Sequence, residues 1–197
     1  AVHESLALYQ ELAPHSNDYG FVLGLAALAY GRLDDLVQAR KFSEQSLAVI
    51  EAAPDRDDSA LPVLLTDHAS LFEALGDFAG AQRAYQRAEE IALKTVGERH
   101  GTYWEARAYH ARLLHQRGDR NRAHALFDQM LPKIPNDWKT GTHDAWVRGV
   151  YGDCLVAEGR AGEAIPLFEA GLRKSVERPF AHEGLIWSAR LAFAYDG

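Results

Sequence analysis

The chain of 197 residues has very little sulfur, with one cysteine and one methionine. A single cysteine cannot form an intrachain disulfide, so the fold must be held by a hydrophobic core, and the redox compartment stays open. No stretch reaches the roughly 18–20 consecutive apolar residues that a membrane-spanning helix needs. The most apolar run, Phe21 to Tyr30, is interrupted by Gly24. We therefore expect neither a disulfide-stapled scaffold nor a membrane partner.

Basic residues are also in the minority. The formal net charge is −7, which argues against general binding to nucleic acid or to an anionic membrane. The hydrophobic and charged fractions, 47% and 25%, are those of an ordinary soluble protein. No secretory signal opens the chain, so a cytoplasmic location is expected. Ala1 in place of an initiator methionine suggests a processed chain or an excised fragment of a longer protein.

Motifs for catalysis and for cofactors are missing as well. The sequence has no Walker loop, no dinucleotide-binding glycine motif, no HExxH and no GxSxG. Cys154 has no cysteine or histidine three or four residues away, and His110 and His115 are five residues apart, which places them on different sides of a helix. We predict no cofactor, no metal and no enzymatic activity. An acid–base pair assembled only in space stays open.

The sequence does contain a pattern of small and large residues that recurs about every 42 residues. In residues 69–88 the pattern consists of Ala69, Phe72, Gly76, Ala81, Tyr85 and Ala88. Forward steps of 42 and then 41 give Ala111, Leu114, Gly118, Ala123, Phe127 and Met130, followed by Gly152, Leu155, Gly159, Ala164, Phe168 and Gly171. A backward step of 42 gives Ala27, Tyr30, Asp34, Ala39, Ser43 and Ser46. A fixed period of roughly 20–50 residues marks a repeat architecture.

Helix packing explains the residue types at these positions. Two helices approach to roughly 8–10 Å only where some contact positions carry small side chains, which the recurring alanines supply. The recurring aromatic residues fill the space between them. The recurring glycine is expected to end the first helix of each pair with a positive φ. Asp34 replaces it in the first full repeat, so we predict a looser or shifted turn there.

Helical spacing and turn residues predict an all-α chain with one repeat domain over residues 1–197. Residues 1–13 form a partial repeat, four helix pairs follow, and a terminal helix ends the chain. The pairs are expected at 18–33 and 35–52, 60–75 and 78–95, 102–117 and 120–131, 142–158 and 161–175, and the terminal helix at 180–195. Pro62 and Pro166 are each expected in a first helical turn, where the missing N–H costs little.

The unit built on Leu65, Ala69, Phe72, Gly76-Asp77, Ala81, Tyr85 and Ala88 resembles a tetratricopeptide repeat (TPR) in its long form of about 42 residues. That form is known from kinesin light chain and bacterial signalling proteins. The loop Val96 to Gly101 is similar to the loop that those arrays carry between repeats, and residues 131–164 are similar to the tail arrays of bacterial Ser/Thr kinases. The resemblance covers nearly the whole chain and implies a right-handed α-solenoid. Arg107, Arg148, His68 and His110 depart from it, because the family has apolar residues at these positions.

In this family the first helix of each pair lines a concave groove. The register of the repeat then implies a peptide-binding set on one face of these helices, which consists of Thr66, Ser70, Glu73, Glu105, Arg112, His115, Trp146 and Asp153. Phe21, Gly24, Leu28 and Gly31 continue this face in the first repeat. The paired lysine and asparagine with which family members grip a carboxylate are absent from these positions, so no C-terminal carboxylate clamp is expected.

Charge is distributed unevenly along the chain. Residues 99–124 carry six arginines against two acidic residues, a net charge of +4, and residues 34–67 carry eight acidic against three basic residues, a net charge of −5. Such asymmetry can steer an acidic partner to the third repeat or let molecules stack head to tail. A solvated helix face is the simpler explanation.

These observations predict a protein- or peptide-binding scaffold within a larger signalling or regulatory protein. The partner is a protein or peptide, which can carry an acidic segment. Two alternatives stay open: a regulatory domain that senses a small molecule or peptide in the groove, and a module that forms homo-oligomers through its terminal helices.

Overall fold

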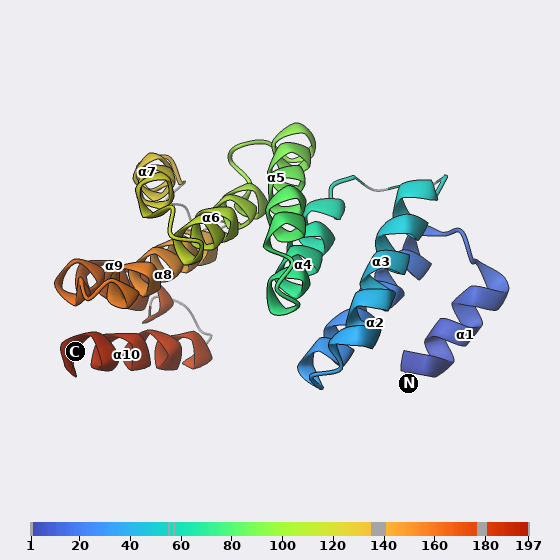
Figure 1. Cartoon of the computed structure of the whole chain (residues 1–197), viewed down its shortest axis with the longest axis horizontal. Helices are drawn as coiled ribbons and strands as arrows, with labels where there is room; N and C mark the ends of the chain where they lie inside the picture. Colours follow the sequence, from blue (N-terminus) through green and yellow to red (C-terminus); the bar gives the residue numbers. More distant parts are fainter. Residues whose placement is uncertain (1, 55, 57, 135–140, 177–180, 197) are drawn as a thin grey trace. The chain divides into compact units, whose positions relative to one another are not determined.

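The computed structural model (Figure 1) describes residues 2–54, 56, 58–134, 141–176 and 181–196. These residues form ten helices and no strand, which confirms the all-α prediction and the α-solenoid class. The helices are α1 (Val2–Leu12), α2 (Asn17–Arg32), α3 (Leu36–Ala52), α4 (Leu61–Ala74), α5 (Phe78–Thr95), α6 (Gly101–Gln116), α7 (Arg120–Met130), α8 (Gly141–Ala157), α9 (Ala161–Val176) and α10 (Ala181–Asp196). Each bound lies within one residue of the range that the sequence predicts.

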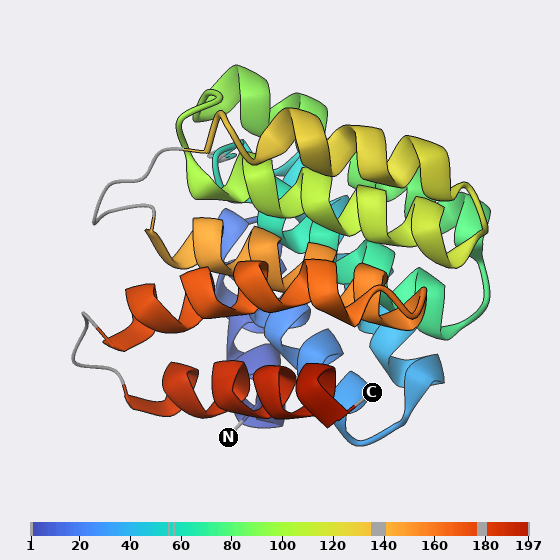
Figure 2. The same ribbon diagram turned by 90° about the vertical axis from the view of Figure 1, so that its left-hand side faces the viewer.

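The chain divides into two compact units, residues 1–96 with α1–α5 and residues 97–197 with α6–α10. Within each unit, consecutive helices pack as antiparallel hairpins, α2 with α3 and α4 with α5 in the first, α6 with α7 and α8 with α9 in the second. In the first unit α1 packs on α2, and in the second α10 packs on α9, beside which it runs in Figure 2.

The four hairpins share one turn geometry. A three-residue turn joins each pair, and its middle residue has a positive φ: 77° at Gly76, 88° at Gly118 and 76° at Gly159. Glycine adopts this conformation without a steric penalty from Cβ. The N–H after the glycine bonds back to a carbonyl of the preceding helix, as Asp77 N does to Phe72 O over 2.9 Å. This hydrogen bond closes the Schellman motif of a helix C-terminus.

The prediction of a looser turn at Asp34 is wrong. Asp34 has a φ of 61°, and the next N–H, from Asp35, bonds to Tyr30 O over 3.0 Å, as in the other three turns. Aspartate is one of the few residues that tolerate the left-handed region, because its short polar side chain bonds locally. Asp34 therefore forms the same turn as the three glycines, and its backbone bears the strain of the positive φ.

Aspartate side chains cap the second helices of three pairs. The carboxylates of Asp35, Asp77 and Asp119 accept a hydrogen bond from the backbone N–H three residues later. Each satisfies one of the N–H groups that a helix N-terminus leaves without a partner. At α9 the corresponding residue is Arg160, which takes part in a side-chain cluster described below.

The predicted core positions are buried in both units. The recurring alanines at 69, 81, 88, 111, 123 and 164 are at most 1% exposed, and Tyr85, Phe127 and Phe168 fill the space beside them. In the second unit a Cβ on Gly152 would lie 2.2 Å from Cε1 of Phe168, so only glycine lets the two helices approach this closely. The small–large alternation therefore sets the packing of each pair, as the sequence predicts.

Two prolines behave differently. Pro62 lies in the first turn of α4, as predicted. Pro166 lies inside α9, so its predicted place in a first turn is wrong. Its ring removes the hydrogen bond to Gly162 O four residues earlier, and both residues are exposed, so water can satisfy that carbonyl.

Among the described residues, no helix is long and apolar enough to cross a membrane.

Three of the four residues that depart from the family pattern make polar contacts. His68 is buried and Nδ1 lies 2.5 Å from Ser43 Oγ. Arg107 donates to Tyr103 Oη and Gln129 Oε1, and Arg148 donates to the buried carboxylate of Asp144. His110 is buried. Each of these positions therefore remains part of its helix pair.

Candidate functional site

A cavity of about 260 Å³ lies in the first unit, between α2, α4 and the inner face of α3. Its walls are mainly formed by leucine, alanine and glycine residues, among them Leu28, Leu64 and Leu71. Gly24, Leu28 and Gly31 belong to the groove face that the sequence predicts for α2, and Ser70 belongs to that of α4. The cavity therefore lies on the side that the family resemblance assigns to ligands.

The cavity has a clear origin in the repeat pattern. Three pairs place an aromatic residue at the recurring position that packs between helices, and these residues, Tyr85, Phe127 and Phe168, are fully buried. The first pair has Ser43 there, and Ser43 lines the cavity. Replacing an aromatic ring by a hydroxymethyl group leaves space that the surrounding helices do not close.

Three serine hydroxyls, those of Ser43, Ser46 and Ser70, are among the polar groups that line the cavity. Ser46 Oγ donates to Gly20 O over 2.7 Å, and Ser70 Oγ lies 3.1 Å from Thr66 O and 3.0 Å from Tyr85 Oη. The Tyr85 hydroxyl itself donates to the Glu73 carboxylate. The serines are thus held in place by protein groups before any ligand arrives.

The Ser43–His68 pair is a buried polar contact at the cavity wall. Desolvation lowers the pKa of His68 below its ordinary value of 6.5, with a smaller opposing effect from Glu44. The imidazole is therefore neutral at pH 7. The hydroxyl–imidazole contact resembles the nucleophile and base of a hydrolase, but Ser43 lies in the middle of α3 and is nearly inaccessible. We interpret the pair as structural.

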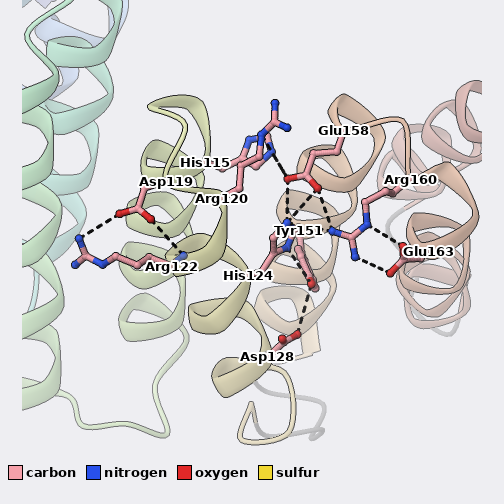
Figure 3. Close-up of polar contacts among 10 residues, drawn as sticks. All are labelled: His115, Asp119, Arg120, Arg122, His124, Asp128, Tyr151, Glu158, Arg160 and Glu163. Atoms are coloured by element: carbon pink, nitrogen blue, oxygen red, sulfur yellow. Dashed lines mark hydrogen bonds and ion pairs between the residues drawn. The ribbon is translucent and has the colours of Figure 1, made fainter.

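A second polar cluster gathers in the other unit around Glu158, which follows α8 (Figure 3). Nε2 of His115 on α6 and Nε2 of His124 on α7 both lie 2.9 Å from Glu158 Oε1. Arg160 donates to Glu158 Oε2 over 3.0 Å and also pairs with Glu163. Because a carboxylate oxygen only accepts, both imidazoles carry their proton on Nε2. A single side chain therefore ties three helices together.

Burial gives this cluster its strength. The Glu158 side chain is 7% exposed and that of His115 is 10% exposed. Desolvation raises the pKa of Glu158, but hydrogen bonds from Arg160, His124 and His115 outweigh it, and the net pKa lies below the ordinary 4.5. Beside it, desolvation and the nearby Asp128 raise the pKa of Tyr151 to about 12. Glu158 is therefore ionised and Tyr151 neutral at pH 7.

Aromatic and charged groups of the predicted groove meet in the second unit. The Arg112 guanidinium lies over the Tyr109 ring at 4.9 Å, and the Trp146 ring lies 5.9 Å from Tyr109. The Asp153 carboxylate accepts two hydrogen bonds from Arg190 of α10, at 2.7 and 3.0 Å. Arg190 in turn stacks on Trp187. Much of this face is thus occupied by contacts within the unit.

The remaining predicted site residues lie as follows. Thr66 donates to Pro62 O, and Glu73 accepts from Tyr85. Glu105 lies on α6 and is half-buried. His115 is bound to Glu158, which leaves little of its surface for a partner. Among the described residues, no group of three or more histidine, cysteine or acidic side chains is arranged to hold a metal ion.

Two features escape the sequence prediction. The cavity depends on Ser43 and Ser46 of α3, whereas the family pattern directs attention to first helices. The signal was present, since serine stands where the other repeats have an aromatic residue. The Glu158 cluster joins residues up to 43 positions apart, and no local pattern marks them as partners.

Comparisons with known proteins agree with this architecture. A scan against protein-family models finds no match. A search of the curated proteins finds none either. Among solved structures, BtubC (BKLC) from P. vanneervenii matches with a TM-score of 0.77 and 15% identity, over 99% of this chain and 80% of that one. Rap protein complexed with competence and sporulation factor matches with a TM-score of 0.65 and 11% identity.

The match to Rap covers 99% of this chain but only 57% of the Rap chain. Sequence identities this low do not assign an activity or a partner. The structural similarity, together with the ten helices of the described residues, shows that the chain has a TPR-like helical repeat fold.

Proposed function

We propose that the chain is a non-catalytic module that binds a segment of a partner protein, and that the cavity of the first unit takes one apolar side chain of that segment. The observation that carries the proposal is the cavity beside Ser43. At the equivalent position the other three helix pairs have a buried aromatic residue. TPR-like repeats typically serve as protein-interaction scaffolds, which supports a binding role. The resemblance to long-form TPR arrays, which are known from bacterial signalling proteins, supports a place within a larger signalling or regulatory protein.

The size of the cavity favours a side chain over a whole small molecule. Pockets for drug-sized ligands measure roughly 300–1,000 Å³, and this cavity measures about 260 Å³. A side chain of an extended or helical segment fits such a space while the rest of the segment lies along the helices. Thr66, Ser70 and Glu73 are then proposed contacts around the cavity. Affinity should be modest, on the order of micromolar, because a disordered segment loses entropy on binding.

The groove residues of the second unit form a further part of the proposal. Arg112 and Trp146 would contact an acidic or aromatic part of the partner, and Asp153 and Glu105 would flank it. The cation of Arg112 and the ring of Trp146 both lie near the Tyr109 ring, which supports a shared contact surface. Arg112→Glu should weaken the binding of an acidic partner, with little change in the melting temperature of the chain.

A matched pair of glycine substitutions tests the cavity. Gly31 lines the cavity, and a Cβ on it would lie 4.0 Å from Ala39 Cβ, which is an ordinary contact, so we choose leucine at this wall position to fill the cavity. Gly162 on α9 has open space around its Cβ and serves as the control. Both changes replace a helical glycine by a better helix former, so neither should lower the stability.

The experiment is a selection of peptides from a phage-displayed random library on the whole chain. We expect clones that bind the parent and Gly162→Leu but not Gly31→Leu. Equal capture by all three proteins would place the binding elsewhere. A library that yields no specific clone would remove the peptide-binding proposal.

A second candidate function, self-association, is favoured by exposed apolar side chains on the first and last helices. Leu12 on α1 is 71% exposed and Phe193 on α10 is 69% exposed. The double variant Leu12→Glu, Phe193→Glu should shift a concentration-dependent sedimentation profile to that of a monomer. Val37→Glu on α3, at a residue 76% exposed, is the control. A parent chain that sediments as a monomer at all concentrations would exclude this function.

A further inference from the structure

His124 in the second unit has hydrogen-bond partners at both of its ring nitrogens. Nε2 lies 2.9 and 3.1 Å from the two oxygens of the Glu158 carboxylate, and Nδ1 lies 3.2 Å from Tyr151 Oη. The Tyr151 hydroxyl also lies 3.4 Å from Asp128 Oδ1. Figure 3 shows these four side chains as one connected series of contacts. The series joins α7, which carries His124 and Asp128, to α8 and to the residue that follows α8.

The Tyr151 hydroxyl lets this series hold either one proton or two on His124. When the imidazole carries only its Nε2 proton, Tyr151 can donate to Nδ1, and water satisfies Asp128, which is exposed. When Nδ1 is protonated as well, it donates to the Tyr151 oxygen, and the Tyr151 proton turns to Asp128. No group loses its partner in either state. A second proton on His124 therefore finds an acceptor already in place.

The charges around His124 favour that second proton. Five charged groups of the described residues belong to the cluster, and they come from α7, from the turn after α8 and from α9: Arg120, Asp128, Glu158, Arg160 and Glu163. Two are positive and three negative, and the Asp119–Arg122 pair at the start of α7 adds no net charge. Arg160 Nη1 lies 3.2 Å from His124 Nε2 and opposes a further cation, but Glu163 holds the same guanidinium through two hydrogen bonds of 2.8 Å. An imidazolium at position 124 thus brings the cluster from a formal charge of −1 to zero.

His115 faces the same carboxylate from α6 but has no such acceptor. Its Nε2 lies 2.9 Å from Glu158 Oε1, and its Nδ1 makes no hydrogen bond to the described residues. A second proton on His115 therefore gains no contact within this part of the chain. Of the two imidazoles, His124 is the better site for the proton.

We propose that His124 is a proton-binding site, and that the proton it takes up strengthens the contact of α7 with α8 as the pH falls from mildly basic to mildly acidic values. This inference is independent of the cavity and of the proposed binding of a partner. Glu158 stays ionised over this range, because its pKa lies below 4.5. When the folded chain binds more protons than the unfolded chain, its free energy of unfolding rises as the pH falls. The second unit thus contains a pH-sensitive element.

Urea unfolding of the whole chain at pH 8 and at pH 5.5 tests the site with two variants. His124→Gln keeps an N–H donor for Glu158 but takes up no proton. Tyr151→Phe keeps the ring that stacks on Phe127, with centroids 4.5 Å apart, but removes the hydroxyl. His15→Gln, at an exposed histidine of the first unit, is the control. We expect the ratio of unfolding constants, variant to parent, to be at least about threefold larger at pH 5.5 than at pH 8 for both variants, and unchanged for the control.

The ratio isolates His124 from the other buried histidine that titrates in this range. Burial lowers the pKa of His68, which acts in the opposite direction, but His68 is present in every variant and cancels. A ratio for His124→Gln that is equal at the two pH values, or smaller in acid, would overturn the proposal. A pH effect that is lost in His124→Gln but kept in Tyr151→Phe would overturn the role of the hydroxyl.

Nitrogen-15 NMR of the imidazoles in the parent chain reads the proton directly and does not depend on the folding of any variant. As the pH is lowered, we expect His124 to gain its Nδ1 proton before His115 does. The reverse order would overturn the assignment to His124.

Discussion

The prediction with the sharpest structural basis concerns Glu158. Its carboxylate accepts hydrogen bonds from His115, His124 and Arg160 inside the second unit, and its side chain is 7% exposed. Glu158→Gln keeps the shape of the side chain but removes the charge and replaces one acceptor oxygen by an NH₂ group. At least one neighbouring donor then faces another donor.

The size of the effect follows from the two histidines. A hydrogen bond to a charged group contributes about 1.5–3 kcal/mol and one between neutral groups about 0.5–1.5 kcal/mol, so each imidazole loses about 1 kcal/mol. A buried donor left without an acceptor adds about 1–3 kcal/mol. We expect Glu158→Gln to lower the free energy of unfolding by about 3–5 kcal/mol at pH 7. Urea unfolding followed by far-ultraviolet circular dichroism measures it.

The pH dependence supplies an independent check. Because the folded pKa of Glu158 lies below the ordinary 4.5, the carboxylate contributes its stability above pH 4.5. That contribution is lost as the pH falls below 4.5 and through the lowered pKa. The difference in unfolding free energy between the parent and Glu158→Gln should therefore shrink as the pH falls below 4.5.

Glu163 provides the matched control. It also pairs with Arg160, over 2.8 Å, but its side chain is 60% exposed. Solvent screens such a pair, so Glu163→Gln should change the stability far less. Equal losses in the two variants, or a Glu158→Gln difference that does not shrink in acid, would refute the reasoning that burial gives the cluster its strength.

Three further substitutions and one labelling experiment test the repeat frame. Gly118→Val should lower the free energy of unfolding in urea by about 1–2 kcal/mol, because a β-branched residue is forced to a φ of 88°; an unchanged midpoint would contradict the turn. Asp34→Gly should raise it by up to about 1 kcal/mol by removing the same strain, and a loss would show that the Asp34 side chain stabilises the turn. Ala81→Leu should cost about 1–3 kcal/mol by overpacking a fully buried contact, and a neutral result would show a looser interface. Burial raises the pKa of the Cys154 thiol to about 12, so a thiol reagent should react with it only on unfolding; fast labelling of the folded chain would contradict its burial.

The recurring positions explain why so much of the fold could be predicted. Ala81, Tyr85 and Gly76 fix a contact, a filling side chain and a turn within one hairpin, and all three properties depend on residues close in sequence. Repetition then multiplies the signal, because each hairpin confirms the register of the next. The errors, at Asp34 and Pro166, are local exceptions where a tolerant residue or an exposed carbonyl absorbs the penalty.

The candidate site was less predictable because the cavity depends on an aromatic side chain that is missing between the helices of the first pair. The register places Ser70 and Gly31 on the predicted groove face, but it does not show that Ser43 leaves a cavity behind them. Likewise, the sequence indicates a basic window with several histidines, yet it does not show that two of them turn toward Glu158. His115 was predicted as a groove residue, and the structure gives it a buried carboxylate as a partner.

The sequence by itself determined the class, the ten helices and the small and large positions of each pair, since helix periodicity and turn chemistry act over a few residues. Only the tertiary structure decided which polar groups meet. Ser43 and His68 are 25 positions apart, and His115 and Glu158 are 43 apart. Hydrogen bonds form over about 3 Å, and distances of that size between separate helices are set by the packing of whole side chains, which no single stretch of sequence encodes.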